Sequence, residues 1–436
     1  MLQPIIIHLD MNSYFASVEQ QDNLAWRNKP VGVCEHLGGI IIAASVDAKK
    51  WGIKTGTPVW EAKKLYPKII LTPTHPDHYR FYTRRMVKVV SDYTAFVEQY
   101  SIDEVFLDIT KACNVSRPAD QPISLSAYQL VNPFEEAIKI AREIKRRFKT
   151  EVGDYLTCSV GIAENKLLAK IASDIKKPDG LVVVKDKGLK IKDCLEFTKD
   201  DLYHRLKLTD IPGIGRRQEK NLNTLGIKTL LDLKNCPKDR LVGRFGVVGG
   251  HHMYNMGQLK ASYKPAVHQE EEIKSIGHMY TLPQEFRQPK FFVPVLYKLC
   301  EMVARRLRRQ ELAGNIVHFY FSDKNSYGWG KSKHLNYYAQ DGREFFFEAI
   351  KMYESQAPKN QILKMSVSFI GITVAGLIPA VRQLSLFGDV EMNQSLLKAL
   401  DKINDKYGDF TVCRAPVLAA GKVFRDSIGF GRIREK

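Results

Sequence analysis

The stretch YSIDEVFLDI, residues 100–109, places two acidic residues side by side within an apolar, strand-like run. Side chains of a regular strand alternate between its two faces, so Asp103 and Glu104 cannot both point the same way from such a strand. The β-rich runs FVEQY (96–100) and EVFLDI (104–109) flank this point and predict a hairpin. At a hairpin tip neighbouring side chains can converge, and a bound cation would offset the repulsion between two converging carboxylates.

A third carboxylate occurs near the start of the chain. PIIIHLD (4–10) is typical of a buried strand, and it ends on Asp10. Three carboxylates from neighbouring strands would form an oxygen-rich site that suits Mg²⁺, and two such ions about 4 Å apart can stabilise an in-line phosphoryl transfer. The alternative is that these residues are solvated strand ends, above all for Asp10, because strands often finish on Asp.

A helical pattern, NSYFASVEQQ (12–21), follows Asp10 directly. The free N–H groups at its start could hold a triphosphate. Phe15 would then face the sugar and exclude a 2′-hydroxyl, with ordinary core packing as the alternative. A second helix, NKLLAKIASDIKKPDG (165–180), presents Lys166 and Lys170 one turn apart, either as phosphate ligands or as a solvated face.

Composition narrows the class of partner. The chain has 436 residues, a formal charge of +18 and 44% hydrophobic residues, which predicts a globular protein of several domains with a polyanionic partner, nucleic acid first and an acidic membrane surface second. Seven cysteines without a CxxC pair argue against a zinc ribbon or a disulfide framework and suit a reducing cytoplasm. The N-terminal sequence has no signal-peptide pattern, and no apolar run approaches the roughly 20 residues needed to span a bilayer.

The second half of the chain contains two patterns that suit DNA. PGIG (212–215) resembles a helix-hairpin-helix turn, in which Gly213 and Gly215 would present amides to a DNA phosphate, although plain helix packing is the alternative. From residue 273 the expected order is βαββαβ, typical of a small sandwich of sheet and helices. Its first helix carries Arg305 and Arg306, which suit contact with a nucleic-acid backbone as well as they suit solvent.

Together these segments resemble the Y-family of translesion DNA polymerases over essentially the whole chain. The matching motifs are HLDMNSYFASVE, SIDEVFLDI, SVGIAENKLLAKIASDIKKPDG, IPGIG and SIGHMY. DMNSYFASVE and SVDAKKWG look closer to UmuC, the catalytic subunit of polymerase V, than to polymerase IV (DinB).

The resemblance implies a multidomain α/β (α+β) protein with the right-hand architecture of a polymerase. The implied parts are a catalytic palm (1–24 and 79–173), fingers (25–78), a helix-hairpin-helix thumb (174–257), a linker (258–272), a βαββαβ little finger (273–380) and a C-terminal tail (381–436).

The resemblance also implies the active site. Asp10, Asp103 and the backbone carbonyl of Met11 would hold two Mg²⁺ ions, and Glu104 would complete the shell of the catalytic ion. Such an enzyme would extend primer–template DNA with dNTPs.

The resemblance to the family is less complete at the residues that would contact the nucleotide. Phe15 matches the steric-gate position, Tyr14 the neighbouring nucleotide-binding position, and Lys166 the triphosphate-binding lysine. Where many members have Tyr and Arg in the fingers, this chain has Val46 and Lys49. Lys49 keeps the charge without the bidentate fork of Arg, and Val46 donates no side-chain hydrogen bond.

The tail contains QLSLF (383–387), which resembles the pentapeptide by which bacterial polymerases bind the sliding clamp. Leu384, Leu386 and Phe387 would fill an apolar pocket, Gln383 would hydrogen-bond at its edge, and Ser385 lies between them. A purely structural role is the alternative.

We therefore expect a cytoplasmic bacterial enzyme that carries out low-fidelity translesion DNA synthesis in the SOS response, without proofreading. The UmuC-like motifs raise, without establishing, the need for a UmuD-like partner. A nucleotidyl cyclase would use a similar palm but would not explain PGIG or QLSLF. A non-catalytic DNA-binding accessory would not explain the intact carboxylates.

Overall fold

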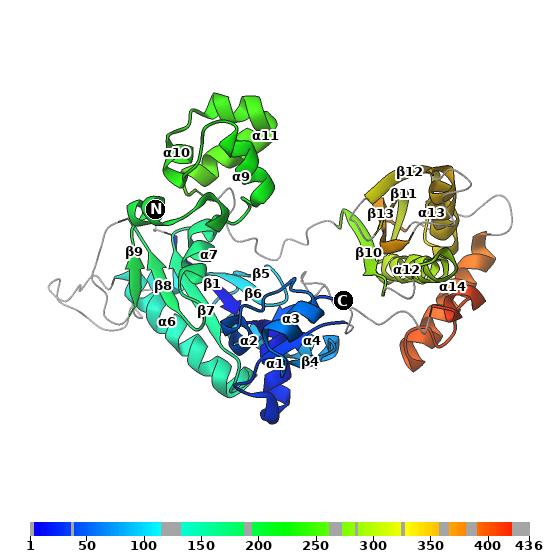
Figure 1. Ribbon diagram of the computed structural model, residues 1–436, viewed down its shortest axis with the longest axis horizontal. Coiled ribbons are helices and arrows are strands. Elements are labelled where there is room, and N and C mark those ends of the chain that lie inside the picture. The colour runs from blue at the N-terminus through cyan, green and yellow to red at the C-terminus, as the bar shows by residue number, and fades with distance from the viewer. Residues whose placement is uncertain are drawn as a thin grey trace, which may run out of the picture. The chain divides into compact units, whose positions relative to one another are not determined.

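A computed structural model describes residues 4–35, 39–114, 132–186, 194–260, 273–283, 287–323, 328–356, 366–380 and 390–420. The described residues up to 260 form one compact unit and those from 273 form a second (Figure 1). No described helix is long and apolar enough to cross a membrane.

The first unit is built on a six-stranded sheet with the order β5-β6-β1-β7-β8-β9. The strands are β1 (Ile6–Met11), β5 (Val97–Gln99), β6 (Glu104–Asp108), β7 (Cys158–Ala163), β8 (Leu181–Val184) and β9 (Leu195–Phe197). β5 and β6 pair antiparallel with Gln99 opposite Val105, which confirms the predicted hairpin. β7, β8 and β9 pair parallel.

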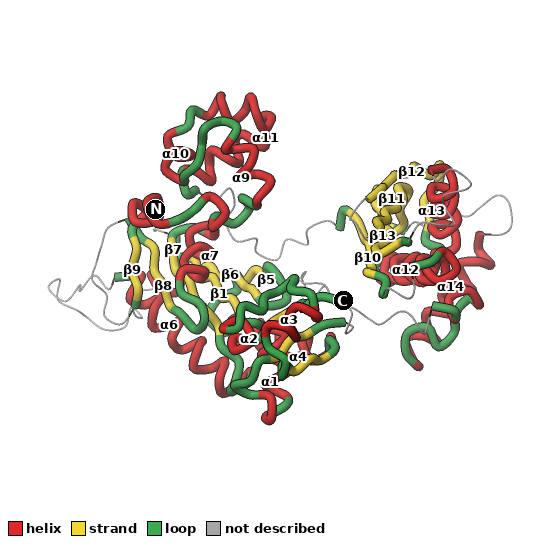
Figure 2. Tube along the Cα trace, in the orientation of Figure 1, coloured by secondary structure: helices red, strands yellow, loops and turns green. Residues whose placement is uncertain are grey.

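Helices cover both faces of this sheet (Figure 2). One face packs against α1 (Tyr14–Asp22), α4 (Pro76–Ser91) and α6 (Pro133–Arg147). α6 forms because Pro133 and the Asn132 cap favour a helix start, and because its buried residues recur at helical spacing, at positions 134, 137, 138, 141 and 144. α5 (Thr110–Asn114) and η3 (Phe148–Val152) flank α6 in sequence.

The opposite face of the sheet carries α7 (Lys166–Ile175), which Asn165 caps by accepting a hydrogen bond from the Leu168 N–H. Gly161 on β7 permits this packing. A Cβ there would lie 2.0 Å from the Ala169 carbonyl oxygen and 2.4 Å from the Ser173 nitrogen, so the helix backbone occupies the space of the missing side chain. After α7 the chain returns as β8, parallel to β7. The sheet therefore extends to Phe197, beyond residue 173 where the sequence predicts the palm to end.

A small three-stranded sheet lies within residues 25–78, the range expected for the fingers. Its order is β3 (Ala43–Ala44), β2 (Val31–Val33) and β4 (Ile70–Thr72). α2 (Val46–Lys50), capped by the Ser45 side chain, and α3 (Val59–Leu65) pack with it around a core of their own. η1 (Leu24–Trp26) leads into this region.

Short helices fill residues 199–257. They are α8 (Lys199–Arg205), η4 (Leu208–Asp210), α9 (Arg216–Asn223), α10 (Leu230–Asn235) and α11 (Lys238–Gly257), and they share one apolar core with α7. Gly213 has φ of 99°, and a Cβ there would lie 2.7 Å from the Met256 methyl group, so this turn requires glycine.

The second unit contains a four-stranded antiparallel sheet with the order β10-β13-β11-β12. Its elements along the chain are β10 (Ser275–Thr281), α12 (Pro289–Arg309), β11 (Leu312–Asp323), β12 (Gly328–Ala339), α13 (Gly342–Gln356) and β13 (Val367–Pro379). This is the predicted βαββαβ order, with both helices packed on one face of the sheet. Two further helices, α14 (Val390–Tyr407) and α15 (Ala415–Leu418), belong to the same unit, and most of the predicted tail up to residue 420 is therefore folded.

We predict that Gly161→Ala lowers the melting temperature by about 2–10 °C, because α7 must move away from the sheet and overpacking costs about 1–3 kcal/mol. Differential scanning fluorimetry measures the shift. Gly243→Ala is the matched control, because its Cβ meets no atom within 4 Å and helix propensity favours Ala by about 0.5–1 kcal/mol. Equal melting temperatures for the two variants would contradict the close packing of α7 on β7.

Candidate active site

Asp10 and Glu104 lie directly opposite each other on the adjacent strands β1 and β6. Residues paired in this way point to the same face of an antiparallel sheet, here the face that carries α7. Each carboxylate has a lysine as counter-charge: Lys177 Nζ lies 2.8 Å from Asp10 Oδ2, and Lys170 forms an ion pair with Glu104 Oε2.

Asp103 lies at the turn beside this pair. Its backbone carbonyl accepts a hydrogen bond from the Met11 N–H at 3.0 Å, and its side chain accepts one from the Ser101 hydroxyl at 2.6 Å. Burial raises the pKa of Asp103 to about 6 against the effect of Ser101, and repulsion from Asp10 and Glu104 adds to the rise. The three predicted carboxylates thus act on one another in a small, partly dehydrated region.

Lys177 is a functional candidate that the sequence reasoning missed. Its position follows from topology: α7 links two parallel strands, so it runs back along β7 and ends near Cys158, which pairs with Met11. The loop after α7 is fixed there, because the Asp179 N–H donates to the Asn12 side chain at 2.8 Å. Burial alone would lower the pKa of Lys177, but Asp10 and Asp174 outweigh it and raise that pKa.

Lys166, the predicted triphosphate ligand, starts α7 at the end away from Asp10. Its Nζ forms an ion pair with Glu98 at 2.7 Å and lies 4.9 Å from the centre of the Phe106 ring. This position gives no support to the expected triphosphate contact of Lys166, because Lys166 and Lys177 lie towards opposite ends of α7.

Lys49, on α2, approaches the same carboxylate from the small sheet. Burial lowers the pKa of Lys49, and Lys177 lowers it further while Asp10 opposes the shift. Within the described part of the chain Lys49 has no ion-pair partner. Val46 starts the same helix and offers no polar side-chain atom. Lys49 and Lys177 repel each other beside Asp10, and a bound anion would relieve that repulsion.

The start of α1 supplies backbone groups next to these lysines. Ser13 precedes the helix in a left-handed conformation, with φ of 49°, and its hydroxyl oxygen is buried without a hydrogen-bond partner. Phe15 is 1% exposed and stacks on Tyr79 with ring centres 4.2 Å apart. Tyr14 is buried as well, and its hydroxyl donates to the Tyr79 carbonyl, so the expected nucleotide contact of Tyr14 is not available to that hydroxyl.

The donor set suits magnesium, since carboxylate and carbonyl oxygens are its preferred protein ligands. In their present rotamers, however, the described residues include no group of three or more His, Cys, Asp or Glu side chains arranged around one ion. Lysine ammonium groups instead form ion pairs with Asp10 and Glu104. A cation that binds Asp10 would replace Lys177 as its counter-charge.

Comparisons with known proteins agree with this geometry. Profiles of the impB/mucB/samB family match residues 9–174 and, for its C-terminal domain, 273–386, and a DNA polymerase-iota thumb profile matches 209–258. A protein named DNA polymerase IV from Pelotomaculum thermopropionicum is 33% identical over 98% of both chains, and one from Moorella thermoacetica is 34% identical over 96% of this chain and 97% of the other. The chain belongs to the Y-family of DNA polymerases.

A solved chimera of the Y-family polymerases Dbh and Dpo4 shares the fold, with a TM-score of 0.68 and 24% identity over 86% of this chain and 99% of the chimera. The expected closer similarity to the UmuC branch is wrong, because these near-full-length relatives are named DNA polymerase IV. The two UmuC-like motifs together span fewer than twenty residues, too few to outweigh similarity over the whole chain.

Two groups of residues were predicted to contact DNA in this Y-family polymerase. Gly215 is exposed at the N-cap of α9, and a Cβ there would meet nothing within 4 Å. In the same region Gly246 (φ of 73°) interrupts α11, and Val247 and Val248 after it are exposed. The clamp peptide, residues 383–387, lies outside the described residues.

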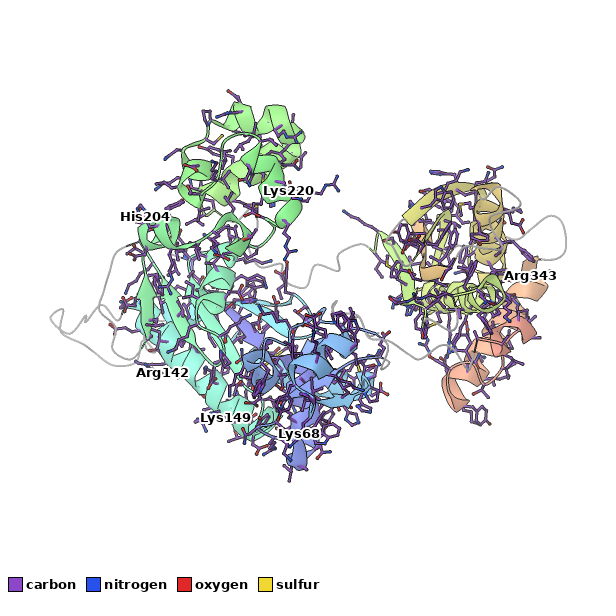
Figure 3. All side chains as sticks on the ribbon, viewed as in Figure 1. Lys68, Arg142, Lys149, His204, Lys220 and Arg343 are labelled. Atoms are coloured by element: carbon purple, nitrogen blue, oxygen red, sulfur yellow. The ribbon has the colours of Figure 1, made fainter. Side chains whose placement is uncertain are left out.

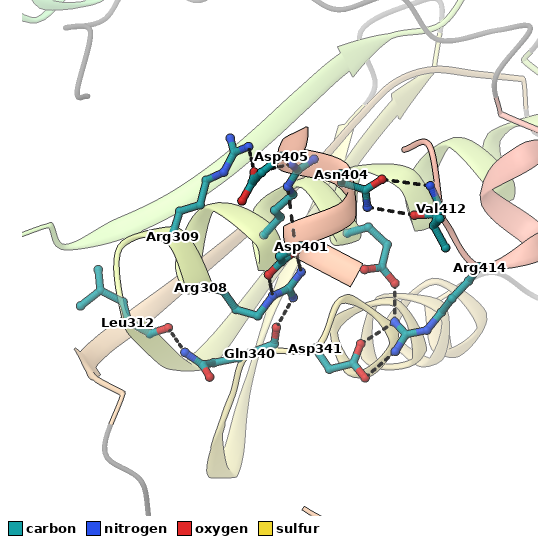
Figure 4. Close-up of polar contacts among 12 residues, drawn as sticks. Arg308, Arg309, Leu312, Gln340, Asp341, Asp401, Asn404, Asp405, Val412 and Arg414 are labelled. Atoms are coloured by element: carbon teal, nitrogen blue, oxygen red, sulfur yellow. Dashed lines mark hydrogen bonds and ion pairs between the residues drawn. The ribbon is translucent and has the colours of Figure 1, made fainter. Parts of the chain in front are cut away.

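The prediction for Arg305 is wrong. Arg305 is 7% exposed and forms ion pairs with Asp405 and Asp409, and Arg308 on the same helix forms paired hydrogen bonds with Asp401 (Figure 4). Arg306 points elsewhere and donates to the Gly277 carbonyl. The acidic side chains come from α14 and the turn after it. Basic residues that remain exposed, such as Arg142, Lys220 and Arg343, project from separate elements (Figure 3).

We predict that Asp103→Asn stabilises the metal-free protein at pH 8 by about 1–3 kcal/mol. The folded protein holds the Asp103 proton up to about pH 6, above the ordinary value of 3.8, so stability due to this group falls as pH rises through that window. Melting curves with EDTA should show the advantage of Asn at pH 8 and its loss below pH 4.

Asp77→Asn, at a 93% exposed carboxylate side chain, is the control and should show little change between these pH values. A lower melting temperature for Asp103→Asn at pH 8 would mean that the Ser101 hydrogen bond outweighs the repulsion.

We predict that Arg305→Ala destabilises the second unit by about 1–3 kcal/mol but changes affinity for primer–template DNA less than about twofold at constant salt. The reason is that its guanidinium is occupied by Asp405 and Asp409. Thermal melting and fluorescence anisotropy measure the two effects, with exposed Arg306→Ala as the matched variant. A fall of about one in the salt slope for Arg305→Ala would instead indicate a phosphate contact.

Proposed function

We propose that the chain extends primer–template DNA by metal-dependent nucleotidyl transfer centred on Asp10, Asp103 and Glu104. The observation that carries the proposal is the pairing of Asp10 with Glu104 across β1 and β6, with Asp103 beside them. Two Mg²⁺ ions, when bound, would activate the primer 3′-hydroxyl and neutralise charge on the phosphates. Asp10, Asp103 and the Met11 carbonyl would hold them, with Glu104 completing the shell of one ion.

The protein's own groups divide the remaining tasks. Lys177 and Lys49 hold the triphosphate in place of the expected Lys166, and the N–H groups at the start of α1 add a second source of positive potential. Phe15 acts as the steric gate, and its stacking on Tyr79 makes it rigid enough to exclude a 2′-hydroxyl. Val46 in the fingers has no side-chain hydrogen-bond donor, so the fingers bind the triphosphate mainly by charge attraction.

The remaining assignments concern partners and domains. Residues 209–258 bind the DNA backbone through amides at Gly213 and Gly215, and QLSLF (383–387) binds a bacterial sliding clamp. We keep the domain boundaries that the sequence predicts, except that we extend the palm to include β8 and β9, which belong to its sheet. The substrate DNA carries damaged bases, synthesis proceeds without proofreading, and the protein works in the bacterial cytoplasm. The similarity to DNA polymerase IV gives no support for a UmuD-like subunit.

Primer extension with one dNTP tests the proposal. Asp103→Asn should reduce kcat at least about 100-fold, because a preorganised charge at the reacting centre is lost. Lys177→Ala should raise the dNTP KM roughly tenfold or more, since charged hydrogen bonds contribute about 1.5–3 kcal/mol. Lys166→Ala should stay within about threefold of the wild type, as for substitutions away from a site. Equal effects of Lys177→Ala and Lys166→Ala would refute the reassignment, and full activity of Asp103→Asn would refute the proposed centre.

A further inference from the structure

A buried histidine beneath Glu104 has no part in the roles assigned so far. His8 is 0% exposed and lies on β1, two residues before Asp10 and on the same face of the sheet. Its Nε2 lies 3.2 Å from Glu104 Oε2, and its Nδ1 lies 2.8 Å from the Ser173 hydroxyl oxygen. The ring therefore links α7 to the candidate catalytic carboxylate.

Packing gives this ring a single position. On one side, Phe106 of β6 lies with its ring centre 4.4 Å away. On the other side, His8 is paired with Gly161 of β7, where a side chain would collide with the Ser173 nitrogen. The absence of that side chain brings α7 down to the sheet, and this close approach lets Ser173 reach the imidazole.

Ser173 holds the other nitrogen of the ring. Its hydroxyl donates to the Lys170 carbonyl at 2.8 Å, so its oxygen is left to accept from His8 Nδ1. The ring plane is thereby fixed from α7, and Nε2 is held towards Glu104 Oε2.

The two contacts of Glu104 fall on the same oxygen atom. His8 and Lys170 both bind Oε2, whereas Oε1 receives no hydrogen bond or ion pair from the described residues. One carboxylate oxygen is thus fixed by the protein and the other is left available. This is the arrangement expected of a carboxylate that is oriented for a ligand by the residues behind it.

We propose that His8, held in orientation by Ser173, is a positioning residue that orients Glu104 and leaves Oε1 to bind the metal. This rests on the proposed function, in which Glu104 completes the shell of one ion. A histidine that served only core packing would need neither the Ser173 contact nor the Nε2 contact, because the ring of Phe could fill the same space.

Three substitutions at His8 separate these roles. His8→Gln retains a donor near the position of Nε2, His8→Asn retains only a polar group near Nδ1, and His8→Phe retains the ring. Ser173→Ala leaves His8 in place but removes the group that holds its Nδ1 atom. Single-nucleotide incorporation gives kcat and the dNTP KM, and melting temperatures report on folding. Electron paramagnetic resonance measures Mn²⁺ binding to the complex with dNTP and a dideoxy-terminated primer, in which no reaction occurs.

For His8→Asn and His8→Phe we expect roughly 10- to 100-fold lower kcat and about tenfold weaker Mn²⁺ binding, with KM for dNTP nearly unchanged. His8→Gln should recover both quantities to within about threefold, and Ser173→Ala should show a smaller loss in the same direction. A Gln variant as impaired as Asn, or an Asn variant that binds Mn²⁺ and turns over like the wild type, overturns the proposal. If His8→Asn does not fold, the proposal is tested by comparing His8→Gln with His8→Phe and by the Ser173→Ala variant. A His8→Gln variant as impaired as His8→Phe would then overturn it. A wild-type protein that neither binds Mn²⁺ nor extends primers overturns the proposed function itself.

Discussion

The contact between the α7 backbone and Gly161 is the constraint on which the candidate active site depends. With no side chain between them, the helix lies against β7, and the residues along it reach the carboxylates on the neighbouring strands. Lys170 meets Glu104, Ser173 meets His8, and the loop beyond the helix brings Lys177 to Asp10. The same helix also shares a core with the helices of residues 199–257, so it joins the catalytic sheet to the region expected to grip DNA.

The electrostatics of the site follow from this arrangement. Three carboxylates in a buried region repel one another, and each of Asp10 and Glu104 is compensated by a lysine that belongs to α7 or its loop. The compensation is unequal, however. Burial raises the pKa of Asp103 to about 6, and the Ser101 hydroxyl that donates to this carboxylate carries no charge to offset the rise fully. Binding of a divalent cation would relieve this repulsion. The charge on Asp103 therefore lowers the stability of the metal-free protein, although the proposed catalysis requires that charge.

Much of this could be predicted from the sequence, because strand and helix periods are local signals. The hairpin around Asp103, the strand that carries Asp10 and the βαββαβ order of the second unit all followed from such patterns, although this strand ends one residue later than predicted, at Met11. Lys177 was missed because the choice among lysines on one helix depends on which end of α7 faces which strand end. Arg305 was misassigned because its partners, Asp405 and Asp409, are about 100 residues away in sequence, and no local pattern reports such pairing.

The ion pairs between α12 and the C-terminal helices show that these helices are part of the second unit. Asp401, Asp405 and Asp409 neutralise a row of arginines on α12, and Arg414 in turn is held by Glu301 and Asp341. A shortened chain that stops after β13 would keep every strand of the sheet, but Arg305, Arg308 and Arg309 would lose their acidic partners. These arginines on α12 could then attract phosphates, and nucleic-acid affinity measured on such a fragment would include attraction that the intact polypeptide does not exert.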